Sequence, residues 1–145
     1  MDLAARFISY ADDFERAYAD RNWQRLAPYF AADAVYECKQ PEALAFRVVG
    51  RAAILERFAT VTDAFDRRFD SRTITFGPPT VNAARVSITG VVLYTLSDAP
   101  PLRLPFTEVA LYRGLEIVHL EDASSDDALA AVADWMARYS DRLAG

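Results

Sequence analysis

The stretch LRLPFTEVALYRGLEIVHLED, residues 102–122, predicts two strands joined by a tight turn at Arg113-Gly114. Apolar and polar side chains alternate along it, as is typical of strands that turn one face toward a core. Two acids, Glu108 and Asp122, occupy positions in this alternation that would ordinarily be apolar. We therefore expect polar chemistry on the buried side of this hairpin.

The alternation places both acids on the inner face of the predicted strands. Glu108 follows Phe106 by two residues, and Asp122 follows Leu120 by two. A carboxyl group in apolar surroundings has a raised pKa, which suits it to general acid or base catalysis near neutral pH. The two acids are thus candidate catalytic residues. The alternative for Asp122 is that it ends its strand and caps the following helix.

The rest of the chain predicts helices early and strands late. Apolar stripes at helical spacing predict helices over Leu3–Asp20, over a short segment with Trp23, Leu26 and Phe30 inward, from Arg51 to Phe69, and from Ser124 to Leu143. Further strands are predicted over residues 33–38, 45–49, 72–76 and 84–97, with a loop around Pro41-Glu42 and a turn or bulge at Gly77-Pro78-Pro79. This order predicts an α+β fold rather than a βαβ fold. We expect a cone, in which a strongly bent antiparallel or mixed sheet wraps around the N-terminal helices, with an extra C-terminal helix.

Length and composition favour one domain over residues 1–145. Hydrophobic residues make up 52% and charged residues 26%, as in an ordinary globular chain. The net charge of −5 and the absence of any basic run longer than Arg67-Arg68 argue against a nucleic-acid partner. No apolar stretch is long enough to span a membrane, and we expect a cytoplasmic protein. One cysteine and one histidine cannot form a conventional zinc site, and no cofactor-binding motif is present, so we predict neither metal nor cofactor.

Other polar side chains could share a cavity with the two acids. Hydroxyl groups that could orient a carbonyl or hydroxyl of a ligand belong to Tyr18, Tyr36, Tyr94 and Tyr112. Tyrosines at such positions otherwise lie in the core with the hydroxyl in water. Cys38 could be a nucleophile, although a buried inert thiol is the favoured reading. His119 could be a catalytic base, but the alternation places it on the outer face.

That outer face of the predicted sheet is apolar. It carries Val91, Leu93, Val109 and Leu111, and an exposed patch of this kind usually meets a partner. We therefore expect a twofold homodimer that packs through these strands. The aromatic side chains of the last predicted helix, Trp135 and Tyr139, together with Met136, could close the mouth of the cone or dock on the second copy.

Three phrases carry a resemblance to a known family. They are NWQRLAPYFAADAVYE at residues 22–37, GRAAI at residues 50–54 and GLEIVHLED at residues 114–122. Over roughly residues 5–125 the chain resembles the SnoaL-like members of the nuclear transport factor 2-like superfamily. The resemblance implies the ketosteroid isomerase-like cone fold. It does not imply one activity, because this superfamily includes isomerases, dehydratases, cyclases, epoxide hydrolases and binding modules.

The resemblance also suggests which side chains face the cone. In the ketosteroid isomerase pattern, a tyrosine of the first helix, an aspartate base at the end of the first strand and a protonated aspartate on a late strand correspond here to Phe14, Cys38 and Glu108. The first two differ in chemistry, which argues against that proton shuttle, while Glu108 is implied to face the cavity. In SnoaL-type cyclases and limonene-type epoxide hydrolases, the acid or base of the last strand corresponds to Asp122, without the arginine and aromatic residues that flank it there.

Three functions remain open from the sequence. The first is a cofactor-free isomerase, lyase, cyclase or hydrolase that acts on a small, mostly apolar molecule through Glu108 and Asp122. The second is a non-catalytic module that binds such a ligand, or a protein partner through the sheet. The third is an interaction domain without a cavity, in which the cone is filled by aromatic side chains, namely Phe7, Phe14, Phe58 and Phe65.

Overall fold

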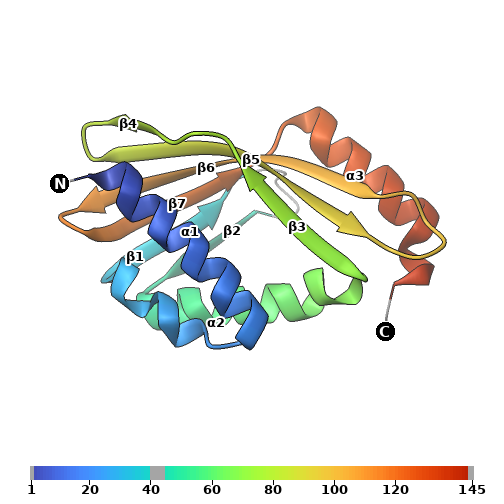
Figure 1. The fold of residues 1–145 in the computed structure, drawn as a ribbon, viewed down its shortest axis with the longest axis horizontal. Helices are drawn as coiled ribbons and strands as arrows, with labels where there is room; N and C mark the ends of the chain where they lie inside the picture. The colour runs from blue at the N-terminus through green and yellow to red at the C-terminus, as the bar shows by residue number, and fades with distance from the viewer. Residues whose placement is uncertain (1, 40–44, 144–145) are drawn as a thin grey trace.

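The computed structural model describes residues 2–39 and 45–143, and the loop expected around Pro41-Glu42 lies outside them. Helices and strands follow the predicted order (Figure 1). The helical elements are α1 (Leu3–Asp20), η1 (Trp23–Tyr29), α2 (Arg51–Ala64), η3 (Asp66–Arg68), α3 (Asp126–Tyr139) and η4 (Ser140–Arg142). The strands are β1 (Phe30–Cys38), β2 (Phe46–Val49), β3 (Ser71–Phe76), β4 (Thr80–Asn82), β5 (Arg85–Thr95), β6 (Leu102–Arg113) and β7 (Glu116–Ala123).

The strands of the described residues form one mixed sheet that does not close on itself. Its order is β2-β1-β7-β6-β5-β3, with β4 paired to β5 beside this path. Every neighbouring pair is antiparallel except β1 and β7, which run parallel. The α+β class and the bent sheet around N-terminal helices are therefore confirmed, and the sheet is mixed rather than purely antiparallel.

The helices α1 and α2 lie on the same side of the bent sheet, whereas α3 lies at the end of the molecule away from the N-terminus (Figure 1). We call the covered side the inner face, and it carries Val86, Ile88, Ala110, Tyr112 and Leu120. These side chains form one apolar cluster with buried residues of α1, η1, β1 and α2, including Phe7 and Leu26, which are fully buried. Burial of this apolar surface is the main source of stability of the cone.

The helix α3 packs against a second apolar cluster and not on the outer face. Its N-terminus is capped by the Ser125 hydroxyl, which accepts a hydrogen bond from the Ala128 N–H at 3.1 Å. Trp135 is buried, its indole N–H donates to the Pro100 carbonyl at 2.8 Å, and its ring packs on Phe69. The second cluster also contains Val92, Tyr94 and Leu102 from the inner face of β5 and β6. Trp135 therefore fixes α3 to this end of the sheet.

Several predicted boundaries differ from the structure. The predicted short second helix is a 3-10 helix that ends at Tyr29, and Phe30 already belongs to β1. Pro28 lies inside this 3-10 helix, where its missing N–H removes a backbone hydrogen bond. The helix that begins at Arg51 ends at Ala64 instead of continuing to Phe69. No strand was predicted over residues 80–82, which form β4; all three residues are exposed and show no alternation of burial.

Two glycines meet local steric demands of the sheet. Gly114, in the turn between β6 and β7, has a φ of 64°, which favours glycine. Gly90 on β5 lies opposite Phe106 on β6. A Cβ atom at residue 90 would lie 2.7 Å from Cζ of Phe106 and 2.8 Å from the carbonyl oxygen of Thr75. The second contact is with backbone, so it could be relieved only by moving β3.

We expect Gly90→Ala to destabilise the protein by about 1–3 kcal/mol, since overpacking of a close contact costs about that much. Urea unfolding followed by circular dichroism measures the change. Thr89→Ala, at an exposed neighbouring position on the same strand, is the matched control and should cost less than about 1 kcal/mol. Equal stability of Gly90→Ala and the unmodified protein would show that the Phe106 ring and β3 can move without cost.

Candidate functional site

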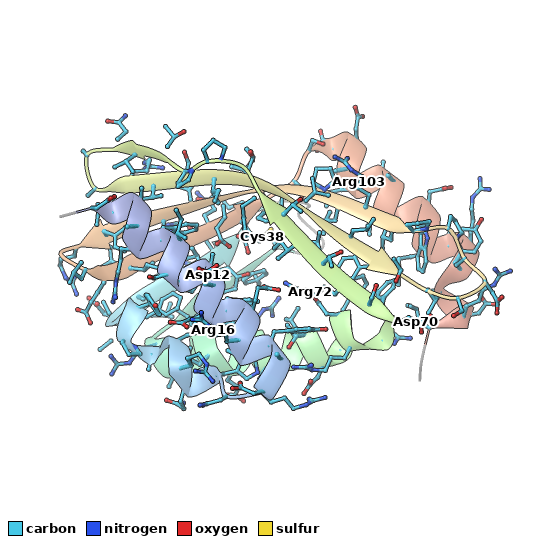
Figure 2. The ribbon with its side chains drawn as sticks, viewed as in Figure 1. Asp12, Arg16, Cys38, Asp70, Arg72 and Arg103 are labelled. Atoms are coloured by element: carbon cyan, nitrogen blue, oxygen red, sulfur yellow. The ribbon has the colours of Figure 1, made fainter. Side chains whose placement is uncertain are left out.

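A cavity of about 470 Å³ lies between the N-terminal helices, the inner face of the sheet and the start of α3. This volume suits a small molecule. Because this space is open, the aromatic side chains do not fill the cone, contrary to the third hypothesis. The lining of the cavity is mostly apolar. Figure 2 labels two lining residues on different strands, Cys38 of β1 and Arg72 of β3. The lining residues are Tyr10, Ala11, Phe14, Glu15, Tyr36, Cys38, Phe46, Arg57, Phe58, Val61, Arg72, Ile74, Phe76, Val92, Leu104, Phe106, Glu108, Asp122, Ala123, Ser124 and Leu129.

The two acids of the hairpin are cross-strand neighbours in this cavity. Glu108 on β6 lies directly opposite Asp122 on β7 in the antiparallel register. On its other side, Glu108 pairs with Ile88 of β5, and Asp122 pairs with Cys38 of β1. Side chains directly opposite each other in an antiparallel pair lie close together. The sheet therefore brings the two carboxyl groups to the middle of its inner face.

Burial raises the pKa of the Glu108 carboxyl well above its usual value, and the negative charge of Asp122 raises it further. Two carboxyl groups so close together in apolar surroundings favour a state in which they hold one proton between them. The raised pKa favours the protonated form of Glu108, which can donate a hydrogen bond or a proton. The ordinary carboxylic acid of a surface residue could not do this at neutral pH.

Tyr36 holds one oxygen of the aspartate. Its hydroxyl donates a hydrogen bond to Oδ2 of Asp122 at 2.6 Å. The other oxygen, Oδ1, is buried and has no hydrogen-bond partner within residues 2–39 and 45–143. A buried acceptor without a partner is costly, so Oδ1 is suited to a hydrogen bond, either from the protonated Glu108 or from a ligand. Asp122 does not cap α3, because the capping hydrogen bond is donated by the Ala128 N–H to the Ser125 side chain.

The remaining predicted site residues divide into two groups. Phe14 and Cys38 line the cavity, as do Tyr36, Glu108 and Asp122. The residues Tyr18, Tyr94 and Tyr112 lie outside the cavity lining. Tyr18 packs beneath the guanidinium groups of Arg67 and Arg72, and the Tyr94 hydroxyl donates to Asp66 at 3.2 Å within the second cluster. Tyr112 is buried in the first cluster.

Two lining residues with polar groups suited to a ligand, Tyr10 and Arg57, were not among the predicted site residues. Tyr10 of α1 is buried, and its pKa is raised well above the usual value by burial and then by the negative charges of Glu108 and Asp122. Its hydroxyl therefore stays protonated and lies in the electric field of the acid pair. The signal was its spacing of three residues from Phe7 and four from Phe14. The second is Arg57 of α2, which looks in the sequence like one of many surface arginines.

A second arginine of the lining is already neutralised. Arg72 donates through Nη1 to Glu15 at 2.6 Å and through Nε to Asp66 at 2.7 Å. Its side chain is only 6% exposed, so these pairs satisfy a buried charge. The ion pairs join β3 to α1 and to η3. Arg72 is thus a structural element of the cavity wall.

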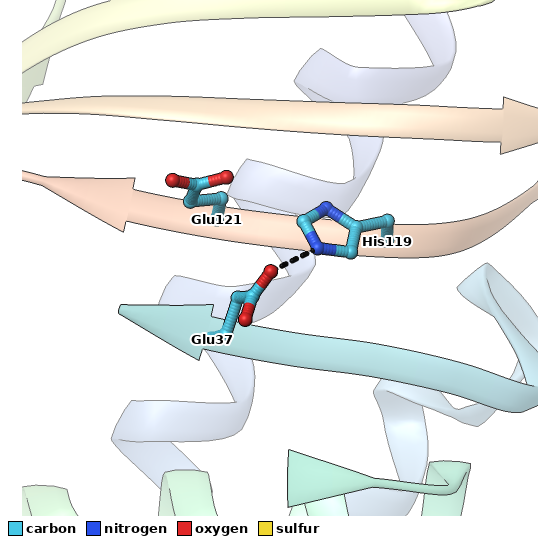
Figure 3. Close-up of side chains that lie close together, drawn as sticks. All are labelled: Glu37, His119 and Glu121. Carbon is cyan, nitrogen blue, oxygen red and sulfur yellow. Dashed lines mark hydrogen bonds and ion pairs between the residues drawn. The ribbon is translucent and has the colours of Figure 1, made fainter. Parts of the chain in front are cut away.

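The histidine lies on the outer face, as predicted. His119 Nε2 is 2.6 Å from Glu37 Oε1, and Glu121 lies beside them (Figure 3). The donor atoms of these three side chains lie within 4.8 Å of one another, and carboxylates with an imidazole can bind divalent metals. However, Lys39 lies 3.9 Å from both Glu37 and Glu121, and Arg47 lies 4.0 Å from Glu37. These two cations balance the two carboxylates, so we assign the group as an ion-pair network rather than a metal site.

Helices that could span a bilayer are absent from the described part of the chain, since none is both long and apolar enough. No protein-family model matches the sequence, and no curated protein matches it. Many solved structures do match in three dimensions.

Three of these structures illustrate the likeness. A protein of ketosteroid isomerase-like fold from Catenulispora acidiphila, in complex with trimethylamine, is 24% identical with a TM-score of 0.62, over 84% of this chain and 89% of that chain. TerC, co-crystallised with polyporic acid, is 16% identical with a TM-score of 0.68, over 91% and 98%. A SnoaL-like polyketide cyclase from Shewanella putrefaciens, so described provisionally, is 10% identical with a TM-score of 0.67, over 94% and 87%.

These identities show the fold alone and not a shared activity. A further neighbour of unknown function from Burkholderia pseudomallei is described as nuclear transport factor 2-like and has a TM-score of 0.67. The fold implied by the three sequence phrases is therefore confirmed. The chain has the nuclear transport factor 2-like fold that is also found in ketosteroid isomerase-like and SnoaL-like proteins.

Proposed function

We propose that this protein binds a small, mostly apolar molecule in the cone cavity and acts on it by cofactor-free acid–base catalysis. The observation that carries the proposal is the cross-strand pair of Glu108 and Asp122 in an apolar cavity. The reaction class is an isomerisation, elimination, cyclisation or hydrolysis. Each of these can proceed by moving a proton between substrate and protein, without an electron carrier.

The two acids have complementary roles in this proposal. The Asp122 carboxylate, held at Oδ2 by Tyr36, accepts a proton from the substrate through Oδ1. Glu108, whose raised pKa favours the protonated form, donates a proton or a hydrogen bond to the oxygen on which negative charge develops. The Tyr10 hydroxyl, near the same pair, can support that oxygen as a second donor. Surrounding apolar side chains exclude water and strengthen these interactions.

The structural neighbours are compatible with this class of ligand. One was co-crystallised with polyporic acid, and others are described provisionally as polyketide cyclases. These names describe those proteins. They support a test of this chain with cyclic and polyketide-like compounds before other substrates.

Replacement of either acid should abolish catalysis while the fold is kept. We expect Glu108→Gln and Asp122→Asn each to lower turnover by roughly 10²–10⁴-fold, the usual contribution of a general acid or base. The measurement is product formation, followed by mass spectrometry, across a panel of enones, epoxides and linear polyketide-like compounds. Circular dichroism verifies that each variant is folded.

Glu121→Gln is the matched control, since Glu121 neighbours Asp122 on β7 but faces the ion-pair network of the outer face. This variant should keep full activity. Full activity in both cavity variants would contradict the catalytic assignment. Panel compounds that raise the melting temperature but yield no product would instead support the non-catalytic binding module, which the presence of Phe14 and Cys38 at the isomerase positions favours.

The pH dependence of stability tests the protonated state of Glu108. Its pKa is raised in the folded protein and is about 4.3 in an unfolded chain, so the folded state holds a proton that the unfolded state releases. The stability contributed by this group therefore falls as pH rises above about 4. Glu108→Gln has no ionisable group at this position and so does not lose stability in this way. Each unit of pKa shift corresponds to about 1.4 kcal/mol in the free energy of unfolding.

We accordingly expect Glu108→Gln to gain melting temperature relative to the unmodified protein as the pH rises from roughly 4 to 8. Differential scanning calorimetry at several pH values measures the difference. Glu121→Gln serves again as the control and should follow the unmodified protein. Parallel curves for Glu108→Gln and the unmodified protein would show that Glu108 ionises normally.

We also propose that the protein forms a homodimer through the outer face. Leu93 and Leu111 are 36% and 37% exposed there, and the partly buried Val91 and Val109 lie on the same two strands. The register of β5 on β6 places Val91 and Leu93 on one side of the Thr89–Thr107 pair, and Val109 and Leu111 on the other side. Exposed apolar side chains gain free energy when a second copy covers them. In a twofold dimer the same surface of each copy would face the other.

We expect light scattering to give a mass of about two chains at micromolar concentration, and Leu111→Lys to shift it toward one. A lysine there would have to be buried without a partner in the interface. Leu115→Lys is the control, because Leu115 is equally exposed but lies in the β6–β7 turn. A monomer in the unmodified protein would contradict the proposed interface.

A further inference from the structure

The cavity contains one arginine whose charge no described residue balances. Arg57 of α2 lines the cavity and forms no ion pair within residues 2–39 and 45–143. Its Nε is buried and has no hydrogen-bond partner among the same residues. Arg72 shows the contrast, since both of its acidic partners are in place. A buried N–H donor without an acceptor among these residues is suited to an acceptor supplied by a ligand.

The position of this guanidinium is set by an aromatic ring. Cζ of Arg57 lies 3.8 Å from the centre of the Phe46 ring, which is a cation–π contact. Phe46 in turn packs edge-on against Tyr36 at 4.9 Å, and Tyr36 is the residue that holds Asp122. The ring covers one face of the guanidinium but cannot accept its in-plane N–H groups. These N–H groups have the fork geometry that binds a carboxylate.

The surroundings of Arg57 in the lining are apolar and partly open. Val61, one turn further along α2, is 39% exposed, and Phe76 at the end of β3 is 37% exposed. Both line the cavity. Large apolar side chains on an exposed cavity rim are typical of a place where a ligand enters and packs.

We infer that the ligand of the cavity is an apolar molecule with a single anionic group, such as a carboxylate, which Arg57 binds. The inference rests on the proposed function, since it names the substrate class of that same cavity. The apolar body would contact Val61 and Phe76, and the anion would satisfy Nε and the neighbouring N–H groups of Arg57. Arg57 would then be a binding residue that orients the ligand relative to Glu108 and Asp122.

Two dyes of similar body and different charge test this inference. Anilinonaphthalene sulfonate carries one anionic group, and phenylnaphthylamine is its neutral counterpart; both fluoresce on entering an apolar site. We expect the unmodified protein to bind both, and Arg57→Gln to raise the Kd of the sulfonate about tenfold, as expected when a charge-assisted hydrogen bond is lost. The neutral dye should bind both proteins equally. Arg47→Gln is the control, because Arg47 is an exposed arginine of neighbouring β2 and should leave both Kd values unchanged.

A further variant locates the dyes. Val61→Trp narrows the rim of the cavity and should weaken both dyes if they bind inside it. Failure of either dye to bind, or binding that Val61→Trp does not affect, would overturn cavity binding and with it the proposed function. Binding of both dyes in the cavity, with Kd values that Arg57→Gln changes equally or not at all, would overturn the anionic ligand alone. Fluorescence titration and the melting temperature of each variant are the measurements.

Discussion

The central constraint in this protein is the strict alternation of side chains along β6 between its two partners. Residues 107–111 of β6, which include Glu108, are paired with both β5 and β7, and this pairing fixes their register on both sides. A slip of one residue would move Glu108 to the outer face and expose Ala110 and Tyr112, which are now buried. The burial of these apolar neighbours therefore holds the Glu108 carboxyl group in apolar surroundings, although the transfer of a carboxyl group out of water is itself unfavourable.

Much of the architecture could be predicted because it rests on local rules. Spacing of apolar residues predicted α1 from Leu3 to Asp20, and period-two alternation predicted the faces of β5 and β6 correctly. The parallel pairing of β1 with β7 could not be derived in this way, because it joins segments about 80 residues apart and leaves no local pattern. The short strand β4 was missed because an edge strand without a buried face has no alternation.

The site was predictable only in part, and for a related reason. An acid in an apolar alternation is a visible anomaly, so Glu108 and Asp122 were found. Tyr10 looks like an ordinary core aromatic residue in the sequence, and only the packing of α1 against the inner face of the sheet brings it near the two acids. Tyr94 shows the opposite error, since its inward position was predicted correctly but α3 and η3 enclose it in the second cluster. The face of the sheet on which a side chain lies can be deduced from the alternation along a single strand. The residues that lie opposite it across a cavity depend on how the whole chain folds.

The second apolar cluster has a consequence for how this fold can change over evolution. The cavity lies between two clusters that are each packed by themselves, with Phe14 and Phe58 on one side and Val92 and Leu104 on the other. A change of side-chain size at the boundary thus alters the shape of the hollow while each cluster keeps its own anchor, Phe7 in one and Trp135 in the other. Stability and ligand choice are consequently separable traits in this chain, and new ligand specificities can arise without loss of the fold.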